Sequence, residues 1–346
     1  MVGVSARARG VVRKLAFSSG ALPLLHRSRN SNTLTVVMFH RVLAINDERW
    51  THADPRYTIT DEQLDQCLEF FGDHYSLVDA EAVRAAARGE RPLPARALLV
   101  TFDDGWADTY QYALAVLRHR RCPAVVFVVS SAVDSSHAFW QERLLRAWKV
   151  RHDPDALATA WRRAGRDGDP PPESWQSLET IRRLISRLRP LVPEARLAIV
   201  EQVEEKVPPG RPEMLTRAQL RSLHDAGVEI GAHGVTHEAL AESMSGIAEL
   251  PESKAQLSEL LDGASVLTMS FPHGSYDAEL LRAATTEYEL VFTSDGILNA
   301  VVDGRPPAVL GRIEIRAGPI VGADGAVSAE LLAVWLFRRS HATVAA

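Results

Sequence analysis

The chain alternates between short apolar runs and longer amphipathic segments. The apolar runs of strand length are residues 34–39, 76–78, 97–102, 124–129, 228–230, 265–270, 290–293 and 309–315. Helical patterns lie between them; Thr60, for example, precedes a segment with Gln63 at the capping-box position and apolar residues on one face. Repeated strand–helix units with fully apolar strands predict a parallel sheet covered by helices.

Residues from about 134 to 215 interrupt this alternation with helical patterns. We expect a helical insertion that packs as a cover on the main domain. The predicted organisation is a basic N-terminal arm at residues 1–33 and a domain at residues 34–346 that contains the insertion. The tryptophans of the insertion are Trp140, Trp148, Trp161 and Trp175. They could stack on sugars, but tryptophans at helical spacing are more often core residues.

Polar residues that could carry chemistry follow the predicted strands. They are His40, Asp103, Asp104, His233, His237, His273 and Asp295. The chain contains neither of the glycine-rich nucleotide-binding motifs, G-x-G-x-x-G after the first strand or G-x-x-x-x-G-K-[ST]. In a (β/α) barrel, the loops after the strands share one mouth, where catalysis takes place. We therefore favour a closed α/β barrel over an open doubly wound sheet.

The composition indicates an ordinary globular protein. The 346 residues are 46% hydrophobic and 24% charged, and the net charge is −5. These values exclude a wholly disordered chain and argue against nucleic acid as a partner, because no basic field covers the molecule. Cys67 and Cys122 form no C-x-x-C pair, so neither a disulfide framework nor a cysteine zinc site is expected. No apolar run reaches the ~18 residues of a membrane-spanning helix.

Residues 1–31 differ from this average, because they contain six arginine and lysine residues and no acidic residue. Their apolar stretch has the length of a signal-peptide core, but Arg27 and Arg29 stand where a cleavage site is expected, and Pro23 interrupts the stretch. A segment that touches anionic lipid and a solvated arm are the other interpretations. We expect a cytoplasmic protein, with peripheral membrane contact through residues 1–31 or export as alternatives.

Two motifs together point to a metal. Asp103 and Asp104 are adjacent carboxylates at a strand end, where burial is costly without a cation or a proton, although Asp-Asp-Gly also suits a plain turn. His233 and His237 could meet one ion if the segment between them forms a helical turn, but H-x-x-x-H alone is a weak signal. One aspartate and two histidines leave coordination positions open for water, which is typical of catalytic metal sites. The other aspartate would then be free as a base, and the residues alone do not say which aspartate it is.

At this point a resemblance to a known family is clear. Thr-Phe-Asp-Asp-Gly at 101–105, followed by Glu-Ile-Gly-Ala-His-Gly-Val-Thr-His at 229–237, resembles the NodB-homology polysaccharide deacetylases, carbohydrate esterase family four. Phe-His-Arg-Val at 39–42 is similar to a subgroup associated with exopolysaccharide synthesis. The resemblance implies a distorted (β/α)₇ barrel that removes N-acetyl groups from sugars with zinc or a similar divalent ion. It also implies that Asp103 is the general base and that Asp104, His233 and His237 are the metal ligands.

The chain departs from the family pattern in two places. Residues 270–274 read Ser-Phe-Pro-His-Gly where the family has Arg-Pro-Pro-Tyr, so the arginine that orients the base is missing there. Residues 310–314 read Leu-Gly-Arg-Ile-Glu and lack the late histidine that supplies the general acid. We therefore expect His40 to serve as the replacement acid and His273 to offer its backbone N–H to the oxyanion. Pro272, Tyr276 and Asp295 are the candidate substrate contacts.

The sequence thus predicts a metal-dependent hydrolase that removes an N-acyl group, N-acetyl above all, from an amino sugar. The substrate would be an oligosaccharide, a polysaccharide or a lipid-linked precursor, and Zn²⁺, Co²⁺ and Ni²⁺ all suit the ligand set. A phosphatase is a rival, but it needs D-x-D, and here the two aspartates are adjacent. A sugar-binding module that has lost turnover is the second rival; against it, a binding protein has no use for an unpaired buried carboxylate such as Asp103.

Overall fold

The computed structural model describes residues 6–165 and 170–344, with the side chains from residue 10 onward. The chain forms two compact units, which are described separately below. One unit holds the chain up to Ala44, Arg56–Asp134 and the chain from Met214; the other holds Ile45–Pro55 and Ser135–Glu213. The first five residues of the predicted arm and residues 166–169 of the predicted insertion lie outside the described part of the chain.

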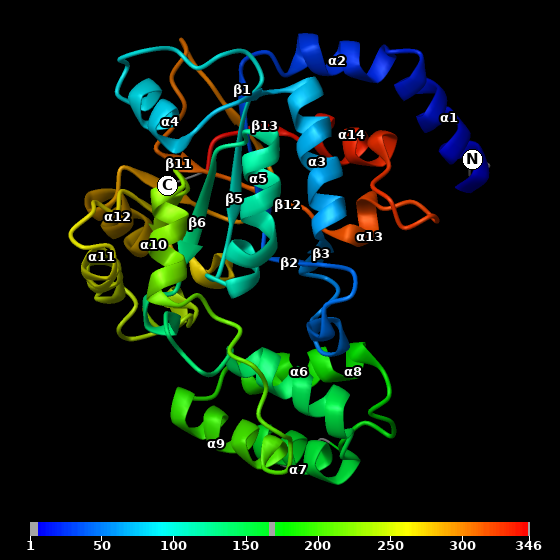
Figure 1. Ribbon diagram of the computed structural model, residues 1–346, viewed down its shortest axis with the longest axis vertical. Helices are drawn as coiled ribbons and strands as arrows, with labels where there is room; N and C mark the ends of the chain where they lie inside the picture. Colours follow the sequence, from blue (N-terminus) through cyan, green and yellow to red (C-terminus); the bar gives the residue numbers. More distant parts are fainter. Residues whose placement is uncertain (1–5, 166–169, 345–346) are drawn as a thin grey trace. The chain divides into compact units, whose positions relative to one another are not determined.

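The first unit is built on a curled, largely parallel sheet (Figure 1). Its central strands run in the order β9 (Leu290–Phe292), β8 (Thr268–Ser270), β7 (Glu229–Ala232), β6 (Ala124–Val128), β5 (Ala97–Phe102) and β1 (Thr33–Phe39). Short strands extend it: β4 (Ser76–Leu77) on β5, β10 (Leu298–Ala300) antiparallel to β1, and β13 (His341–Ala342) on β10. A separate parallel pair is formed by β2 (Arg41–Leu43) and β3 (Thr58–Thr60).

The predicted strand at residues 309–315 is in fact two strands, and the break between them closes the barrel. β11 (Val309–Leu310) pairs with β9, whereas β12 (Ile313–Glu314) pairs with β1, at the opposite end of the six central strands. Gly311 stands at the break, where a Cβ atom would lie 2.5 Å from the carbonyl oxygen of Asp295. The buried Asn299 side chain accepts from the Gly311 N–H at 2.8 Å and donates to the Gly311 carbonyl at 2.9 Å. The distorted (β/α) barrel is therefore confirmed, but the prediction of one continuous last strand is wrong.

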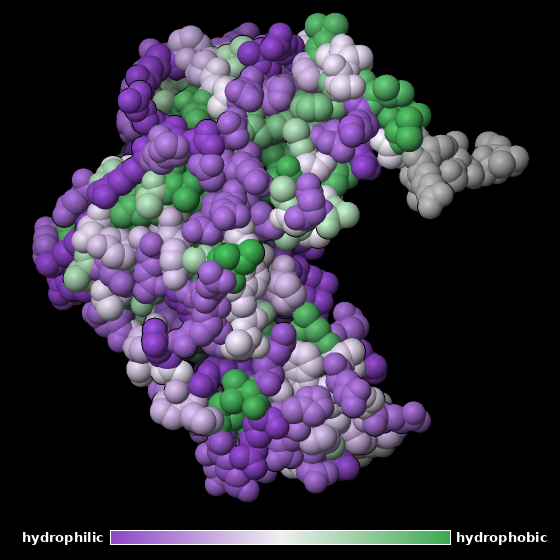
Figure 2. Space-filling view, turned by 45° about the vertical axis from the view of Figure 1, so that its right-hand side comes forward, coloured by the Kyte–Doolittle hydropathy of each residue, from purple (hydrophilic) through white to green (hydrophobic). Residues whose placement is uncertain are grey.

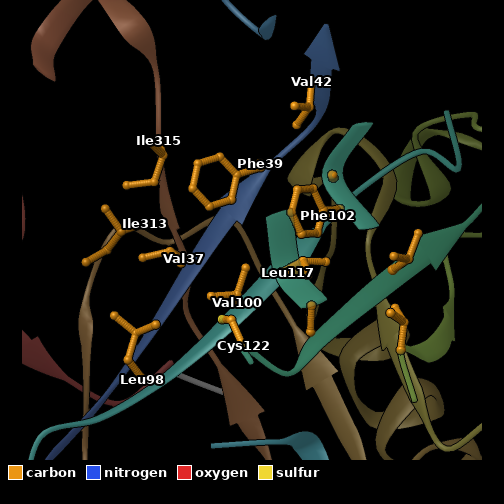
Figure 3. Packing of buried hydrophobic residues seen from close by; sticks show 14 of the residues in the cluster. Val37, Phe39, Val42, Leu98, Val100, Phe102, Leu117, Cys122, Ile313 and Ile315 are labelled. Atoms are coloured by element: carbon orange, nitrogen blue, oxygen red, sulfur yellow. The ribbon is translucent and has the colours of Figure 1, made fainter. Parts of the chain in front are cut away.

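Alternate residues of the barrel strands face two different apolar layers. Toward the helices, Phe39 and Phe102 stack with ring centroids 5.4 Å apart, with Val100 and Ile313 close by (Figure 3). The other layer contains a second cluster with Phe127 of β6 among its members. All these side chains are essentially inaccessible to solvent. This two-sided burial explains why the strands read as continuous apolar runs.

Helices cover the outside of the barrel (Figure 1). They are α3 (Asp61–His74), α4 (Ala80–Ala87), α5 (Leu114–Arg120), α10 (Arg217–Asp225), α11 (Glu249–Leu260), α12 (Ala278–Glu287), α13 (Ala317–Ile320) and α14 (Ala329–Phe337). A capping box begins α3 at Thr60, as the sequence predicts, and the structure shows a second one at Thr216, where α10 begins. A π-helical turn at Thr109–Ala113 precedes α5, and 3-10 turns lie at Ser130–Ala132, Leu240–Glu242 and Pro272–Gly274. Among the described residues, no helix has the length and apolar character needed to cross a membrane.

The described part of the N-terminal arm is helical and docked on the barrel. It forms α1 (Ala6–Ser18) and α2 (Ala21–Arg29). Phe17 stacks on Phe70 at 6.4 Å, and the buried His26 stacks on Phe337 at 3.9 Å. Arg29 donates to the carbonyl oxygen of Phe337 at 3.0 Å. One side of each helix is thus committed to the barrel.

The second unit is a small helical bundle with its own core. It contains a 3-10 turn at Glu48–Thr51 and the helices α6 (Trp140–Arg151), α7 (Pro154–Ala164), α8 (Leu178–Leu188) and α9 (Pro193–Glu204). The tryptophans at 140, 148, 161 and 175 are buried in that core. They are therefore structural residues of this unit, as their helical spacing indicates.

Candidate active site

The ends of the barrel strands bring the predicted polar residues to one mouth. In the parallel pairing of β1 with β5, Phe39 lies opposite Phe102, and the N–H of Asp103 donates to the carbonyl oxygen of Phe39 at 3.0 Å. His40 and Asp103 therefore follow neighbouring strands, as predicted. The N–H of His233 likewise donates to the carbonyl of Val128 at the end of β6, at 2.9 Å.

Asp104 and the two histidines of the H-x-x-x-H motif form a tight cluster. Oδ1 of Asp104 lies 3.5 Å from Nε2 of His233 and 3.2 Å from Nε2 of His237. Oδ2 accepts a 2.9 Å hydrogen bond from the Trp106 indole. Burial alone would raise the pKa of Asp104, but the imidazoles of His237 and His233 hold it well below its ordinary value. A carboxylate oxygen and two ring nitrogens that converge within 4.8 Å of one another are a donor set that fits a divalent ion.

The segment between the two histidines is a loop rather than the helical turn considered from the sequence. Gly234 and His237 both have positive φ angles, 73° and 64°, which turn the chain sharply enough to aim both rings at Asp104. Nδ1 of His233 is 2.9 Å from the carbonyl oxygen of Ser270. Because a carbonyl only accepts, this contact places a proton on Nδ1 and makes Nε2 the ring nitrogen that faces Asp104.

Glu249, the first residue of α11, holds this loop from behind. Its buried carboxylate accepts from the N–H of Val235 at 2.7 Å, from the N–H of Thr236 at 3.0 Å and from the Thr236 hydroxyl at 2.7 Å. Three donors compensate a carboxylate that is only 3% exposed. No sequence signal marks this residue, since a glutamate at a helix start normally indicates only a favourable charge near the helix dipole.

Asp103 faces a different partner. The Arg312 guanidinium holds both its carboxylate oxygens, Nη1 to Oδ1 at 2.6 Å and Nη2 to Oδ2 at 2.8 Å. Arg312 is itself fixed, because it also donates to Ser270 Oγ at 2.6 Å and to the carbonyl of Thr293 at 3.1 Å. Burial opposes ionisation of Asp103, but the charges of Arg312 and of His233 outweigh it and lower the pKa of Asp103 below its ordinary value.

This ion pair changes two sequence-based expectations. Arginine is indeed absent from residues 270–274, but an arginine from the break between β11 and β12 contacts Asp103 instead. Asp103 is also not an unpaired buried carboxylate, so that argument against a binding module was wrong. The signal for Arg312 was present: a lone arginine after a glycine, inside the otherwise apolar run at 309–315. A charge in such a run needs a buried partner.

The turn after β1 is tied to the Asp104 side of the mouth. Arg41 forms a buried ion pair with Asp108, Nε to Oδ2 at 3.0 Å, and its guanidinium lies over the Trp106 ring at 4.1 Å. His40, half-buried, lies against Tyr57 with ring centroids 5.0 Å apart. A positive charge on its ring would favour ionisation of both Asp103 and Asp104.

The remaining candidates lie at the ends of β8 and β9. Nε2 of His273 is 3.0 Å from the carbonyl oxygen of His237, and the two rings are 4.5 Å apart, so His273 packs directly on the histidine cluster. Tyr276 donates to Asp295 Oδ2 at 2.7 Å, and burial together with Asp295 raises the pKa of Tyr276 to about 12. Pro272 is buried beside the positive-φ residue His273.

The fold and the residues at its mouth define a barrel enzyme. Its mouth holds Asp103, which Arg312 keeps ionised, next to a carboxylate and two imidazoles whose donor atoms fit a divalent ion. A family model described as polysaccharide deacetylase matches residues 90–291. That is more than half of the chain, and the chain therefore belongs to the polysaccharide deacetylase family.

Individual relatives agree with this assignment. A poly-beta-1,6-N-acetyl-D-glucosamine N-deacetylase of Escherichia coli K12 is 39% identical over 61 residues, which is 18% of this chain and 9% of that protein's length. The deacetylase PplD of Streptococcus pyogenes superposes with a TM-score of 0.54 at 17% identity, over 88% of this chain and 98% of that one. IcaB from Ammonifex degensii superposes with a TM-score of 0.54 at 18% identity, over 88% of this chain and 97% of that one. At these identities the two structures show a shared fold.

Proposed function

We propose that this deacetylase removes the N-acetyl group from an amino sugar and that it needs a divalent metal ion to do so. The observation that carries the proposal is that two adjacent carboxylates have different partners. Asp103 forms an ion pair with Arg312, and Asp104 contacts the imidazoles of His233 and His237. The name of the E. coli relative supports an N-acetylglucosamine polymer as the substrate class. A lipid-linked precursor offers the same acylated amine.

Asp104, His233 and His237 would hold the ion. Their one oxygen and two nitrogen donors suit Zn²⁺, the ion we propose, and suit Co²⁺ and Ni²⁺ as well. A bound ion of this kind acidifies a water molecule and polarises an acyl carbonyl. The buried Trp106 and the Ser270 carbonyl orient the ligand side chains, since each contacts a ligand directly.

Asp103 is the proposed base. A carboxylate kept ionised by Arg312 still has lone pairs that can accept the proton of the attacking water. The bidentate contact also fixes the plane of the carboxylate, so that no rotation is needed when the proton arrives. His40 follows the strand next to the one that ends at Asp103, and it is the proposed donor of a proton to the departing amine. His273 is the proposed donor of a backbone N–H to the oxyanion.

Tyr276, Asp295 and Pro272 remain proposed sugar contacts. Asp295 accepts from both Tyr276 and Thr293, so its orientation is fixed within the protein. A rigid hydroxyl–carboxylate pair of this kind is suited to the hydroxyl groups of a sugar ring. The cellular compartment of the enzyme stays a prediction from the sequence.

The decisive experiment measures acetate release from β-1,6-linked and β-1,4-linked N-acetylglucosamine oligomers after the protein has been stripped of metal and reloaded with Zn²⁺, Co²⁺ or Ni²⁺. The expected result is turnover that depends on reloading and that disappears in Asp104→Ala. Equal acetate release by the stripped and the reloaded protein would overturn metal dependence. Release from O-acetylated but not N-acetylated sugars would overturn the amide assignment.

A further inference from the structure

The two N-terminal helices have one face on the barrel and a second face that the barrel does not use. At 100° per residue, Val11, Val12 and Leu15 of α1 lie within one third of the helix circumference, on the side opposite the docked Phe17. They are 59%, 63% and 62% exposed. Leu24, which is 67% exposed, lies across α2 from the buried His26 in the same way.

Exposed apolar side chains concentrate on this face. Five of the thirteen large hydrophobic side chains that are exposed among the described residues lie between residues 11 and 25. Figure 2 shows apolar (green) atoms gathered over the N-terminal helices. A surface helix that packs only against its own protein would carry polar residues on its outer side. An apolar outer side indicates a contact with something outside the chain.

The charge of the segment that carries this face selects the kind of partner. The first 46 residues contain seven of the 39 lysines and arginines and none of the 44 acidic residues, so the remaining 300 residues carry a net charge of −12. Lys14 and Arg27 are exposed on the two helices. A second copy of the chain on this face would bring these cations against each other, which disfavours a dimer. An anionic bilayer would attract this end of the molecule and repel the rest, and would thus orient it.

We propose that α1 and α2 form a peripheral docking surface for an anionic membrane, with Val11, Val12, Leu15, Leu24 and Leu25 entering the acyl boundary and Lys14 and Arg27 at the headgroups. Helices that combine apolar and basic residues in this manner lie in the plane of the interface. α2 ends just before β1 begins at Thr33, whereas His40 follows the other end of β1, so the surface and the barrel mouth lie at opposite ends of that strand. The surface would therefore hold the enzyme at a membrane without taking part in hydrolysis. The inference does not depend on the proposed substrate.

The test is co-sedimentation of the full chain with vesicles of pure phosphatidylcholine and of phosphatidylcholine with phosphatidylglycerol. Wild type should bind the anionic vesicles at low salt, and Lys14→Glu/Arg27→Glu should lower the partition coefficient at least about tenfold, because each basic residue near such a surface contributes roughly a fivefold factor. Val12→Ser/Leu15→Ser should weaken binding by a similar factor. The matched controls Arg282→Glu and Val302→Ser, exposed on the same unit, should bind like wild type.

Every variant should melt at the wild-type temperature and hydrolyse a soluble oligosaccharide at the wild-type rate, since none of these residues is in the site. The proposal is overturned if the variants and the controls partition equally, or if wild type binds neutral vesicles as well as anionic ones. It is also overturned if ultracentrifugation shows a dimer that Val12→Ser/Leu15→Ser dissolves, because a second copy would then occupy the face.

Discussion

Asp103 and Asp104 are neighbours in the chain, both buried, and yet they have opposite surroundings. Asp103 meets a guanidinium that cannot lose its proton, with hydrogen bonds to both oxygens. Asp104 meets two imidazole nitrogens that could equally well face an ion. The positive φ of Asp104, 79°, turns the chain between them, so that the two side chains point to different partners. Identical side chains thus acquire different partners from the elements opposite them: Asp103 from the strand break at Arg312, and Asp104 from the histidine loop.

The largest loss of activity should come from replacing Asp104, the proposed metal ligand of the two aspartates. Asp104→Ala reduces three donors to two, and we expect bound metal and activity to be lost together. Metal content by elemental analysis and acetate release should be measured on the same sample. Full occupancy of the metal in Asp104→Ala would contradict the assignment, and His237→Ala is the parallel variant that should behave alike.

A substitution of Asp103, the proposed base, should lower the rate of hydrolysis without affecting metal binding. Asp103→Asn keeps the shape of the side chain but cannot take up a proton, so kcat should fall at least ~10²-fold, the usual contribution of a positioned base. Metal content should stay at the wild-type level. A kcat of Asp103→Asn within a few-fold of the wild-type value would show that Asp103 is not the base. The two aspartates would then not have the separate roles proposed for them.

His40 allows the proton-donation step to be tested apart from both carboxylates. His40→Gln should cut kcat on an amide substrate by ~10²-fold, because a departing amine needs a proton. An activated ester, whose leaving group needs none, should be hydrolysed at close to the wild-type rate. If both substrates slow by the same factor, His40 positions the sugar instead; if neither slows, the proton comes from Asp103 itself.

Arg312 should matter through Asp103 alone. Arg312→Lys keeps a positive charge but loses the two-pronged contact, and we expect kcat to fall about tenfold or more while KM and metal content change little. Arg312→Met leaves Asp103 buried without a partner, which should lower the free energy of unfolding by about 3–5 kcal/mol. The double variant Asp103→Asn/Arg312→Met should recover part of that stability, as measured by urea denaturation. No recovery would mean that Arg312 stabilises the barrel through its other contacts.

The contrast between Arg312 and the other site residues also shows what a sequence can predict here. Strand ends could be placed from apolar runs, and residues at the ends of parallel strands share one edge, so His40, Asp103 and the histidine motif could be expected together. The apolar run around Arg312 indicates that this residue needs a buried partner, but it does not identify Asp103 as that partner, because the position of Arg312 depends on a break in what reads as one strand. That break is fixed by Gly311 at its close approach to Asp295 and by the buried Asn299, which are long-range contacts without a local signature.

The sequence predicts that His233 and His237 act together, but it does not predict the backbone conformation of the loop between them. Spacing alone suggested a helical turn, whereas positive φ angles at Gly234 and His237 bring the rings together in a loop. Such a conformation needs support from outside the segment, because an L-residue with positive φ is strained. The support comes from Glu249, fourteen residues after Val235 and on another element. Local patterns do not reveal a contact of this range.

Glu249 therefore offers the smallest and most specific test. Glu249→Ala removes the acceptors for two backbone N–H groups and one hydroxyl behind the ligand loop, and we expect metal affinity to weaken about 10–100-fold, the usual effect of losing a partner that supports a ligand. Glu249→Gln keeps one carbonyl oxygen for the N–H groups and should lose no more than a few-fold. Glu252→Ala, an exposed glutamate on the same helix, is the matched control and should bind metal like wild type. Metal titration of the stripped protein measures all three, with thermal unfolding of the metal-free variants recorded alongside. Equal affinities for Glu249→Ala and Glu252→Ala would mean that the loop keeps its shape unaided, and the difference between the two aspartates would then rest on the histidines and Arg312 alone.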